Sequence, residues 1–341
     1  EAFRNLDIAS FPFCPNVTAL YGDNGSGKSS FIEALYYLSY GRSFRTSNAN
    51  ALICSDAPAF IIHADIVQNG FDYRCSVLRE EGKTRAKINA SPAPLSHIAK
   101  LFPTLFADSD TYRCFMGSST YRRRMFDWLG FHVKPGYIET ARKYNAVLKN
   151  RNAALKMCQD TRPWDALLIQ NANELAILRK EIFEEFLVFY DGSQSTFLKK
   201  EAWVFSPGYE AEMDYAVILE RNKSKDVAVK RTTEGAHTAD WLYQIGGTRA
   251  KDVLSQGQQK TAFFHTISAM DRHMQSVGVI PFLLIDDYSA ELDLENRALL
   301  HSLVFEREGQ GLITSVYKPD LSRGELASMF HVKQGGLEFV R

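Results

Sequence analysis

The chain has 341 residues, of which 45% are hydrophobic and 23% charged, a balance typical of a soluble globular protein with one large or two modest domains. Forty basic and forty acidic side chains cancel, so the overall charge predicts no partner, and any nucleic-acid surface must be a local patch. Five scattered cysteines without a CxxC pair argue against a disulfide framework or a zinc site and favour a reducing cytoplasm. The densest apolar run, residues 280–285, is too short to cross a bilayer, so no membrane partner is expected.

The sequence predicts a phosphate-binding loop at residues 22–29. The β-prone run Val17–Tyr21 leads directly into a GxxxxGK(S/T) pattern, and a helix with apolar residues on one face follows. Glycines let successive backbone N–H groups converge on a phosphate, Lys28 neutralises phosphate oxygens, and the hydroxyl of Ser29 can bind Mg²⁺. The chain is therefore expected to bind a nucleoside triphosphate with Gly22, Asp23, Asn24, Gly25, Ser26, Gly27, Lys28, Ser29 and Ser30.

After the first helix, the residues up to 107 are mostly of strand type. Alternating runs over 59–67 and 71–78 are separated by Gln-Asn-Gly, which predicts a hairpin, and residues 83–89 can add a strand. From about 110 to 200 the pattern becomes helical, with few glycines. Strand character resumes near 202–204. The sequence thus predicts a head assembled from both ends of the chain and an inserted helical arm.

Basic residues recur along the predicted arm. Arg142, Lys149 and Lys156 are spaced by seven, which places them on one helix face, and Arg151 lies beside this stripe. Such a stripe suits sequence-independent contacts with DNA phosphates, although a solvated face is the alternative. A second cluster, residues 122–124, has two interpretations. One is DNA contact, and the other is a structural role, in which the arginines pair with carboxylates of the head or sense nucleotide near the dimer interface.

Residues 254–260 read LSQGQQK. Apolar residues recur afterwards at helical spacing, so Ser255 is a candidate N-cap and Gly257 leaves the amides of the first turn unobstructed. A helix N-terminus with free N–H groups can bind an anion. A capped helix start without a ligand is the alternative.

Residues 281–293 read PFLLIDDYSAELD. Four apolar residues that end at Asp286 predict a buried parallel strand with a carboxylate at the sheet's C-terminal edge, where the Mg²⁺-binding acid of a P-loop fold belongs. Asp287 follows directly, and an acid in this position can orient or deprotonate an attacking water.

GDNGSGKS, LSQGQQK and IDDYSAELD, in this order, resemble the Walker A, signature, Walker B and D-loop motifs of ABC-type ATPases. The resemblance implies that the signature of one subunit closes on the nucleotide held by another, so that ATP drives a homodimer. It adds Gln258, Asp293 and Thr314 to the nucleotide site, and it makes Asp287 and Lys28 the catalytic pair. The family usually has glutamate at the position of Asp287, and the shorter side chain of aspartate implies slow hydrolysis.

Further blocks resemble the RecF family: FRNL at 3–6, GRSFRT at 41–46, and YRRRMFDW at 121–128. This resemblance implies a cytoplasmic ABC/SMC-like α/β ATPase head with mixed sheets and an inserted helical arm. It also implies ATP and Mg²⁺ as cofactors, binding of DNA at single-strand/duplex junctions, and action with RecR and RecO to load RecA on gaps. The expected head comprises residues 1–107 and 201–341, and the arm residues 108–200.

The sequence departs from the family pattern in places. No Q-loop glutamine is found near residues 103–106, and the GPHR(A/D)D block is present as Gly-Ala-His-Thr-Ala-Asp at 235–240. Two other functions stay open. One is a clamp that binds ATP without hydrolysing it. The other is the nucleotide-binding subunit of an ABC transporter, which the long arm and the GRSFRT block disfavour.

Overall fold

The computed structural model describes residues 1–6, 10, 12–108, 110–190, 198–288, 294–319 and 327–340. Two compact units form within it: one combines residues 1–111 with 280–341, and the other spans 112–279. Among the described helices, none is both long enough and apolar enough to cross a membrane.

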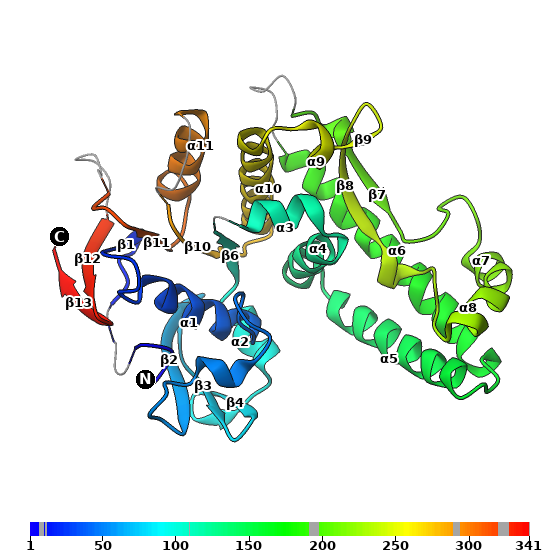
Figure 1. The fold of residues 1–341 in the computed structure, drawn as a ribbon, viewed down its shortest axis with the longest axis horizontal. Coiled ribbons are helices and arrows are strands. Elements are labelled where there is room, and N and C mark those ends of the chain that lie inside the picture. Colours follow the sequence, from blue (N-terminus) through cyan, green and yellow to red (C-terminus); the bar gives the residue numbers. More distant parts are fainter. Residues whose placement is uncertain are drawn as a thin grey trace. The chain divides into compact units, whose positions relative to one another are not determined.

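A six-stranded sheet is the centre of the first unit (Figure 1). Five of its strands run parallel and only the edge strand β13 is antiparallel. Parallel strands place their carboxyl ends at one edge, where α/β folds bind ligands. The strand order is β13 (Gly336–Phe339), β12 (Ala327–Lys333), β1 (Val17–Tyr21), β11 (Gly311–Ser315), β10 (Phe282–Ile285) and β6 (Thr104–Ala107).

Helix α1 (Lys28–Tyr40) follows β1 and packs on this sheet. Its Phe31 and Ile32 are buried against Leu284 of β10 and Leu312 of β11. The helix begins at the phosphate loop and ends at Gly41, whose left-handed backbone caps it. Burial of this face therefore fixes the position of the loop at its N-terminus. Helix α11 (Leu294–Phe305) precedes β11.

A second, antiparallel sheet of four strands belongs to the same unit. The predicted hairpin is confirmed, because β2 and β3 pair in register around Asn69 and Gly70, which both have positive φ. The 3₁₀ turn η1 (Ala49–Leu52) and helix α2 (Leu95–Leu101) flank the core of this sheet. The strands are β2 (Ala59–Gln68), β3 (Phe71–Glu80), β4 (Lys83–Ile88) and β5 (Ser91–Pro92).

The second unit is mainly helical. Two of its long helices, α5 and α6, pack side by side, and an aromatic cluster that includes Phe126 and Trp241 fills the core. The helices are α4 (Ser119–Val133), α5 (Tyr137–Lys156), α6 (Arg162–Phe189), α7 (Tyr215–Arg221), α8 (Lys223–Val229), α9 (Ala250–Val253) and α10 (Gln256–Ser276), preceded by α3 (Thr111–Gly117). Three short strands pair beside them: β7 (Trp203–Ser206), β8 (Asp240–Ile245) and β9 (Thr248–Arg249). Two 3₁₀ turns, η2 (Lys200–Ala202) and η3 (Ala236–Thr238), complete the unit.

This helical unit extends beyond the predicted arm of residues 108–200. The reason is that β8 packs on α4: Trp241 stacks on Phe126 with ring centroids 4.7 Å apart, and Asp240 pairs with Arg122 of the same helix. Helix α10 also packs on α4 and α6. Residues 201–279, placed by the sequence in the head, are therefore packed with the arm helices.

Candidate nucleotide site and nucleic-acid surface

The phosphate loop follows β1 and opens α1, as predicted. Gly22, Gly25 and Gly27 all have positive φ, a conformation that side chains rarely adopt. A Cβ on Gly22 would lie 2.5 Å from the carbonyl oxygen of Val332, so the close approach of loop and β12 requires glycine. The hydroxyl of Ser26 is buried and has no hydrogen-bond partner among the described residues. The glycines therefore allow a tight turn, and the buried hydroxyl of Ser26 within it is available to a ligand.

Lys28, the first residue of α1, lies within this turn and is only 8% exposed. Its ammonium group donates to the carbonyl oxygens of Gly22 at 2.6 Å and Asp23 at 2.8 Å. Burial lowers the pKa of Lys28, while the charges of Asp286, Asp287 and Asp23 act in the opposite direction. An ammonium has three N–H donors, so two carbonyls leave one for an anion.

Asp286 ends β10 at the sheet's carboxyl edge, as predicted. Its Oδ1 accepts a hydrogen bond from the hydroxyl of Ser29 at 3.0 Å and another from the hydroxyl of Thr314 at 2.6 Å. Strands β10 and β11 are parallel neighbours, which brings Asp286 and Thr314 together. The structure thus joins three predicted residues from three separate segments.

Asp287 has a left-handed backbone with φ of 62°, a strained conformation for a residue with a side chain. Strand β11 secures this turn: the backbone N–H of Asp287 donates to the hydroxyl of Thr314 at 2.8 Å, and that of Tyr288 to the carbonyl of Thr314 at 2.7 Å. Thr314 therefore orients the side chain of Asp286 and the backbone of Asp287.

A cavity of about 490 Å³ lies between these segments. It is polar and open to solvent, and its volume matches that of a small-molecule site. Three lining residues were not assigned from the sequence: Asn5, Arg45 and Val316. Asn5 and Arg45 belong to blocks, FRNL and GRSFRT, on which the family resemblance rests. The cavity is lined by Asn5, Asn24, Gly25, Gly27, Lys28, Ser29, Ser30, Arg45, Asp286, Asp287, Thr314 and Val316.

These residues fit a magnesium–nucleotide complex. No group of three or more histidine, cysteine or carboxylate side chains that could hold a metal was found in the described ranges. Mg²⁺ does not need such a cage, because it is usually bound by one or two carboxylates together with phosphate oxygens and waters. The hydroxyl of Ser29 and the carboxylate of Asp286 are the protein ligands that this arrangement offers.

The segment after β6, where the resemblance implies a Q-loop glutamine, carries Asp108. Its carboxylate accepts the backbone N–H groups of Asp110 at 2.9 Å and Thr111 at 2.7 Å, and so starts helix α3. Burial raises the pKa of Asp108; the two backbone hydrogen bonds oppose the shift, and the nearby charge of Asp286 adds to it. Asp108 here stabilises the turn that precedes α3.

The predicted N-cap of the signature segment is confirmed in the helical unit. Ser255 and Gln258 form a reciprocal capping box: the Ser255 hydroxyl accepts from the Gln258 N–H at 3.3 Å, and the Gln258 amide oxygen accepts from the Ser255 N–H at 2.9 Å. Ser255 is exposed and Gly257 half-buried, at the start of the 21-residue helix α10. Asp293 lies outside the described residues.

Three residues of the predicted basic stripe lie at the surface of α5, and their contact with DNA stays a prediction. Arg142, Lys149 and Lys156 are all exposed, and none of them forms an ion pair within the part of the chain that the structure describes. Their spacing of seven residues keeps them on one side of the helix. They form an accessible row of positive charge.

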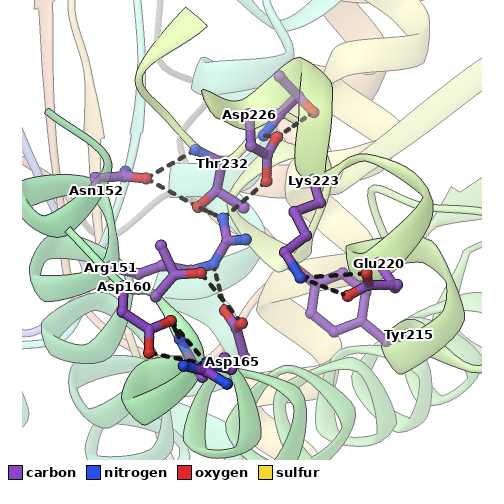
Figure 2. Close-up of polar contacts among 12 residues, drawn as sticks. Arg151, Asn152, Asp160, Asp165, Tyr215, Glu220, Lys223, Asp226 and Thr232 are labelled. Carbon is purple, nitrogen blue, oxygen red and sulfur yellow. Dashed lines mark hydrogen bonds and ion pairs between the residues drawn. The ribbon is translucent and has the colours of Figure 1, made fainter. Parts of the chain in front are cut away.

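Arg151, which the sequence predicted to contact DNA, is instead buried and paired within the protein (Figure 2). It is 1% exposed, and its guanidinium donates to Asp165 of α6 at 2.7 Å and to Asp226 of α8 at 2.8 Å. A residue two positions after Lys149 is turned by about 200° around the helix, so it faces the core. Burial alone would lower the pKa of Arg151, but the hydrogen bonds with Asp165 and Asp226 raise it above its ordinary value. Arg151 is a structural cross-link and not a DNA contact.

Two arginines of the 122–124 cluster on α4 form contacts within the protein, which favours a structural role over DNA contact. Arg122 is buried and pairs through two nitrogen atoms with the carboxylate of Asp240 at 2.8 and 2.7 Å. Arg123 donates to the carbonyl oxygen of Ala239 at 2.7 Å. Both arginines hold the 235–240 block in place. That block lacks the family's proline and arginine, and its Thr238 hydroxyl contacts the carbonyls of Gly208 at 2.8 Å and Gly235 at 2.9 Å.

The parallel sheet, the phosphate loop that contains Lys28, and the Ser29–Asp286–Thr314 cluster define an ABC/SMC-type P-loop ATPase. The chain matches the family described as RecF/RecN/SMC N terminal domain over residues 1–337. Proteins named DNA replication and repair protein RecF are similar to it throughout. The one from Edwardsiella ictaluri is 32% identical over 98% of this chain and 96% of its own length, and that from Proteus mirabilis is 32% identical over 92% and 90%. The chain belongs to the RecF family.

Solved structures agree with this fold. The recombination mediator protein RecF of the RecFOR pathway, solved with ATP, aligns over all of this chain and 96% of its own with a TM-score of 0.86 at 23% identity. The Smc head domain of Pyrococcus furiosus, solved with an extended coiled coil and bound to the C-terminal domain of ScpA, covers all of this chain with a TM-score of 0.57 at 16% identity. The expected ABC/SMC-like fold is thus confirmed.

Proposed function

We propose that this chain is a cytoplasmic, ATP-dependent DNA-binding protein of recombinational gap repair with a slow, DNA-stimulated ATPase activity. The cluster that joins Ser29, Asp286 and Thr314 beside Lys28, all around one cavity, carries the proposal. The names of the relatives, which describe DNA replication and repair, point to the same process.

Several residues of the cavity have defined roles in this proposal. Lys28 and the amides of the loop bind the phosphates of ATP, and Ser29 with Asp286 holds Mg²⁺. When bound, Mg²⁺–ATP supplies the phosphoanhydride bond and the charge neutralisation that its cleavage requires. Asp287 orients the attacking water and accepts its proton. Thr314 fixes the backbone of Asp287. Because the aspartate side chain is short, this limits how closely its carboxylate can approach the attacking water, which favours slow turnover.

The signature segment completes the site in a homodimer. Ser255, Gly257 and Gln258 form the N-terminus of α10, where the helix dipole favours an anion. We infer that this end caps the nucleotide bound to a second copy of the chain, together with Asp293. ATP then binds the dimer more tightly than the monomer and shifts the equilibrium toward it.

DNA binds through the α5 stripe in this proposal. Arg142, Lys149 and Lys156 contact backbone phosphates, which suits recognition of single-strand/duplex junctions without sequence preference. The solved relative belongs to the RecFOR pathway, so we infer RecR and RecO as partners and the loading of RecA on gapped DNA as the result.

The experiment is a fluorescence-anisotropy titration of gapped, single-stranded and duplex DNA with and without ATP. The proposal expects ATP to tighten binding, with gapped DNA preferred, and Lys28→Ala to remove the ATP effect while leaving the weak ATP-independent binding. Equal affinity with and without ATP on all three substrates would contradict it.

A non-hydrolysing clamp is the second candidate, because Asp287 stands where the family usually has glutamate and its backbone is held in the left-handed region. Release of inorganic phosphate, measured with and without DNA, separates the two candidates. Phosphate release above that of Lys28→Ala supports the ATPase, and release equal to it supports the clamp.

A further inference from the structure

Glu33 is a buried carboxylate that the phosphate site does not use. It lies on α1 with 0% of its side chain exposed, and Arg4 pairs with it through two nitrogen atoms, both at 2.9 Å. A buried carboxylate is costly unless charge and hydrogen bonds satisfy it. The pair therefore fixes Arg4 on the back of the helix that carries Lys28.

A second partner connects Glu33 to the GRSFRT segment. Its Oε1 accepts a hydrogen bond from the hydroxyl of Ser43. The same hydroxyl accepts the backbone N–H groups of Arg45 at 2.9 Å and Thr46 at 3.0 Å, which fixes the turn around them. The Arg45 guanidinium lies over the ring of Phe44, 5.6 Å from its centroid, and lines the cavity. Glu33 thus reaches a cavity-lining arginine through one hydroxyl.

Arg4 connects Glu33 to Asn5, another residue that lines the cavity. The residue after it, Asn5, accepts the Ser30 hydroxyl at 2.7 Å and donates to the carbonyl of Gly25 at 3.4 Å. Arg4 itself has a left-handed backbone, held by its N–H bond to the carbonyl of Leu52 at 2.7 Å. The arginine–carboxylate pair and this bond place Asn5 against the phosphate loop.

We propose that Glu33 is a positioning residue of the nucleotide site, which holds two residues that line the phosphate cavity: Arg45 through Ser43, and Asn5 through Arg4. The guanidinium of Arg45 has five N–H donors in a planar arrangement that suits phosphate oxygens. Since Arg4 neutralises Glu33, the carboxylate orients these groups without repelling the anion. This inference rests on the proposed binding of ATP.

A double-mutant cycle tests the link between Ser43 and Arg45. The affinity for ATP carrying a fluorescent N-methylanthraniloyl group is measured for Ser43→Ala, Arg45→Ala and the double variant, with Ser47→Ala as the control in the same loop. We expect Arg45→Ala to weaken binding about tenfold and Ser43→Ala about fivefold. In the Arg45→Ala background, Ser43→Ala then has less than about a twofold effect, because its action passes through Arg45.

Additional outcomes separate positioning from a general effect on folding. Glu33→Gln retains an acceptor for Ser43 and is expected to bind the labelled ATP more tightly than Glu33→Ala. Binding is measured at a temperature at which Ser43→Ala and Ser47→Ala are both fully folded, as their thermal melting without nucleotide verifies. Equal effects of Ser43→Ala in both backgrounds, or no effect at all, would overturn the inference. Failure of the unmodified protein to bind the labelled ATP would instead refute the proposed function.

Discussion

Replacing Arg151 with Met separates the structural role of this residue from the DNA contact that its sequence position suggested. The substitution retains much of the side chain's length and removes its charge. It leaves Asp226, which is 1% exposed, without the cation at 2.8 Å, and it removes the donors to Asp165 and Thr232. Asp226 also accepts the N–H of Thr233 at 2.9 Å, so it remains in place as a buried charge.

The size of the loss in stability follows from the burial of Asp226. Removing one partner of a buried ion pair costs about 3–5 kcal/mol, because the other charge stays desolvated. In a domain of about 150–250 residues, each kcal/mol lowers the melting temperature by ~2–4 °C. We therefore expect Arg151→Met to lower the melting temperature of the helical unit by about 6–20 °C.

The assay combines calorimetry with DNA binding at low temperature, where the variant is still folded. The matched control is Lys149→Met, an exposed position on the same helix, for which we expect a change within about 0.5 kcal/mol in stability. Arg151→Met should bind DNA within about twofold of the unmodified protein, since a buried guanidinium makes no phosphate contact. Unchanged melting with a large loss of DNA affinity would refute this assignment.

Three further predictions follow from the site and the surface. Lys149→Glu with Lys156→Glu should weaken DNA binding and reduce the slope of log affinity against log salt by up to about 2; an unchanged slope would mean that the stripe is only solvated. Asp287→Asn should slow phosphate release about 100-fold or more with ATP affinity retained, and unchanged release would exclude Asp287 as the base. Burial lowers the pKa of His237 below its ordinary value, so the neutral form stabilises the fold above about pH 6.5 and this stability is lost as the pH falls. Urea midpoints at pH 7.5 and 5.5 should therefore differ more in the unmodified protein than in His237→Gln, and an equal difference would contradict this assignment.

The parts of the site that the sequence could predict are those that one continuous segment determines. The phosphate loop requires glycines at fixed spacing, the capping box of Ser255 and Gln258 is local, and a buried apolar strand leads to Asp286. Each depends on neighbours within a few residues, so their pattern is visible without a fold.

The parts that it could not predict depend on contacts between distant segments. Arg45 and Asn5 line the cavity because Glu33 and Ser30 of α1 hold the segments that carry them, and no spacing encodes those pairs. The extent of the helical unit has the same origin, because Trp241 and Phe126 meet only in the folded chain. Arg151 could have been assigned correctly from its angular position relative to Lys149.

The central claim, that ATP joins two copies of this chain through Ser255, is tested most directly by sedimentation velocity. The unmodified protein and Ser255→Arg are compared with and without ATP, after ATP binding to both has been verified. The proposal predicts that ATP converts the unmodified protein to a dimer, whereas Ser255→Arg binds ATP and remains a monomer. An ATP-dependent dimer of undiminished strength in Ser255→Arg would contradict the claim.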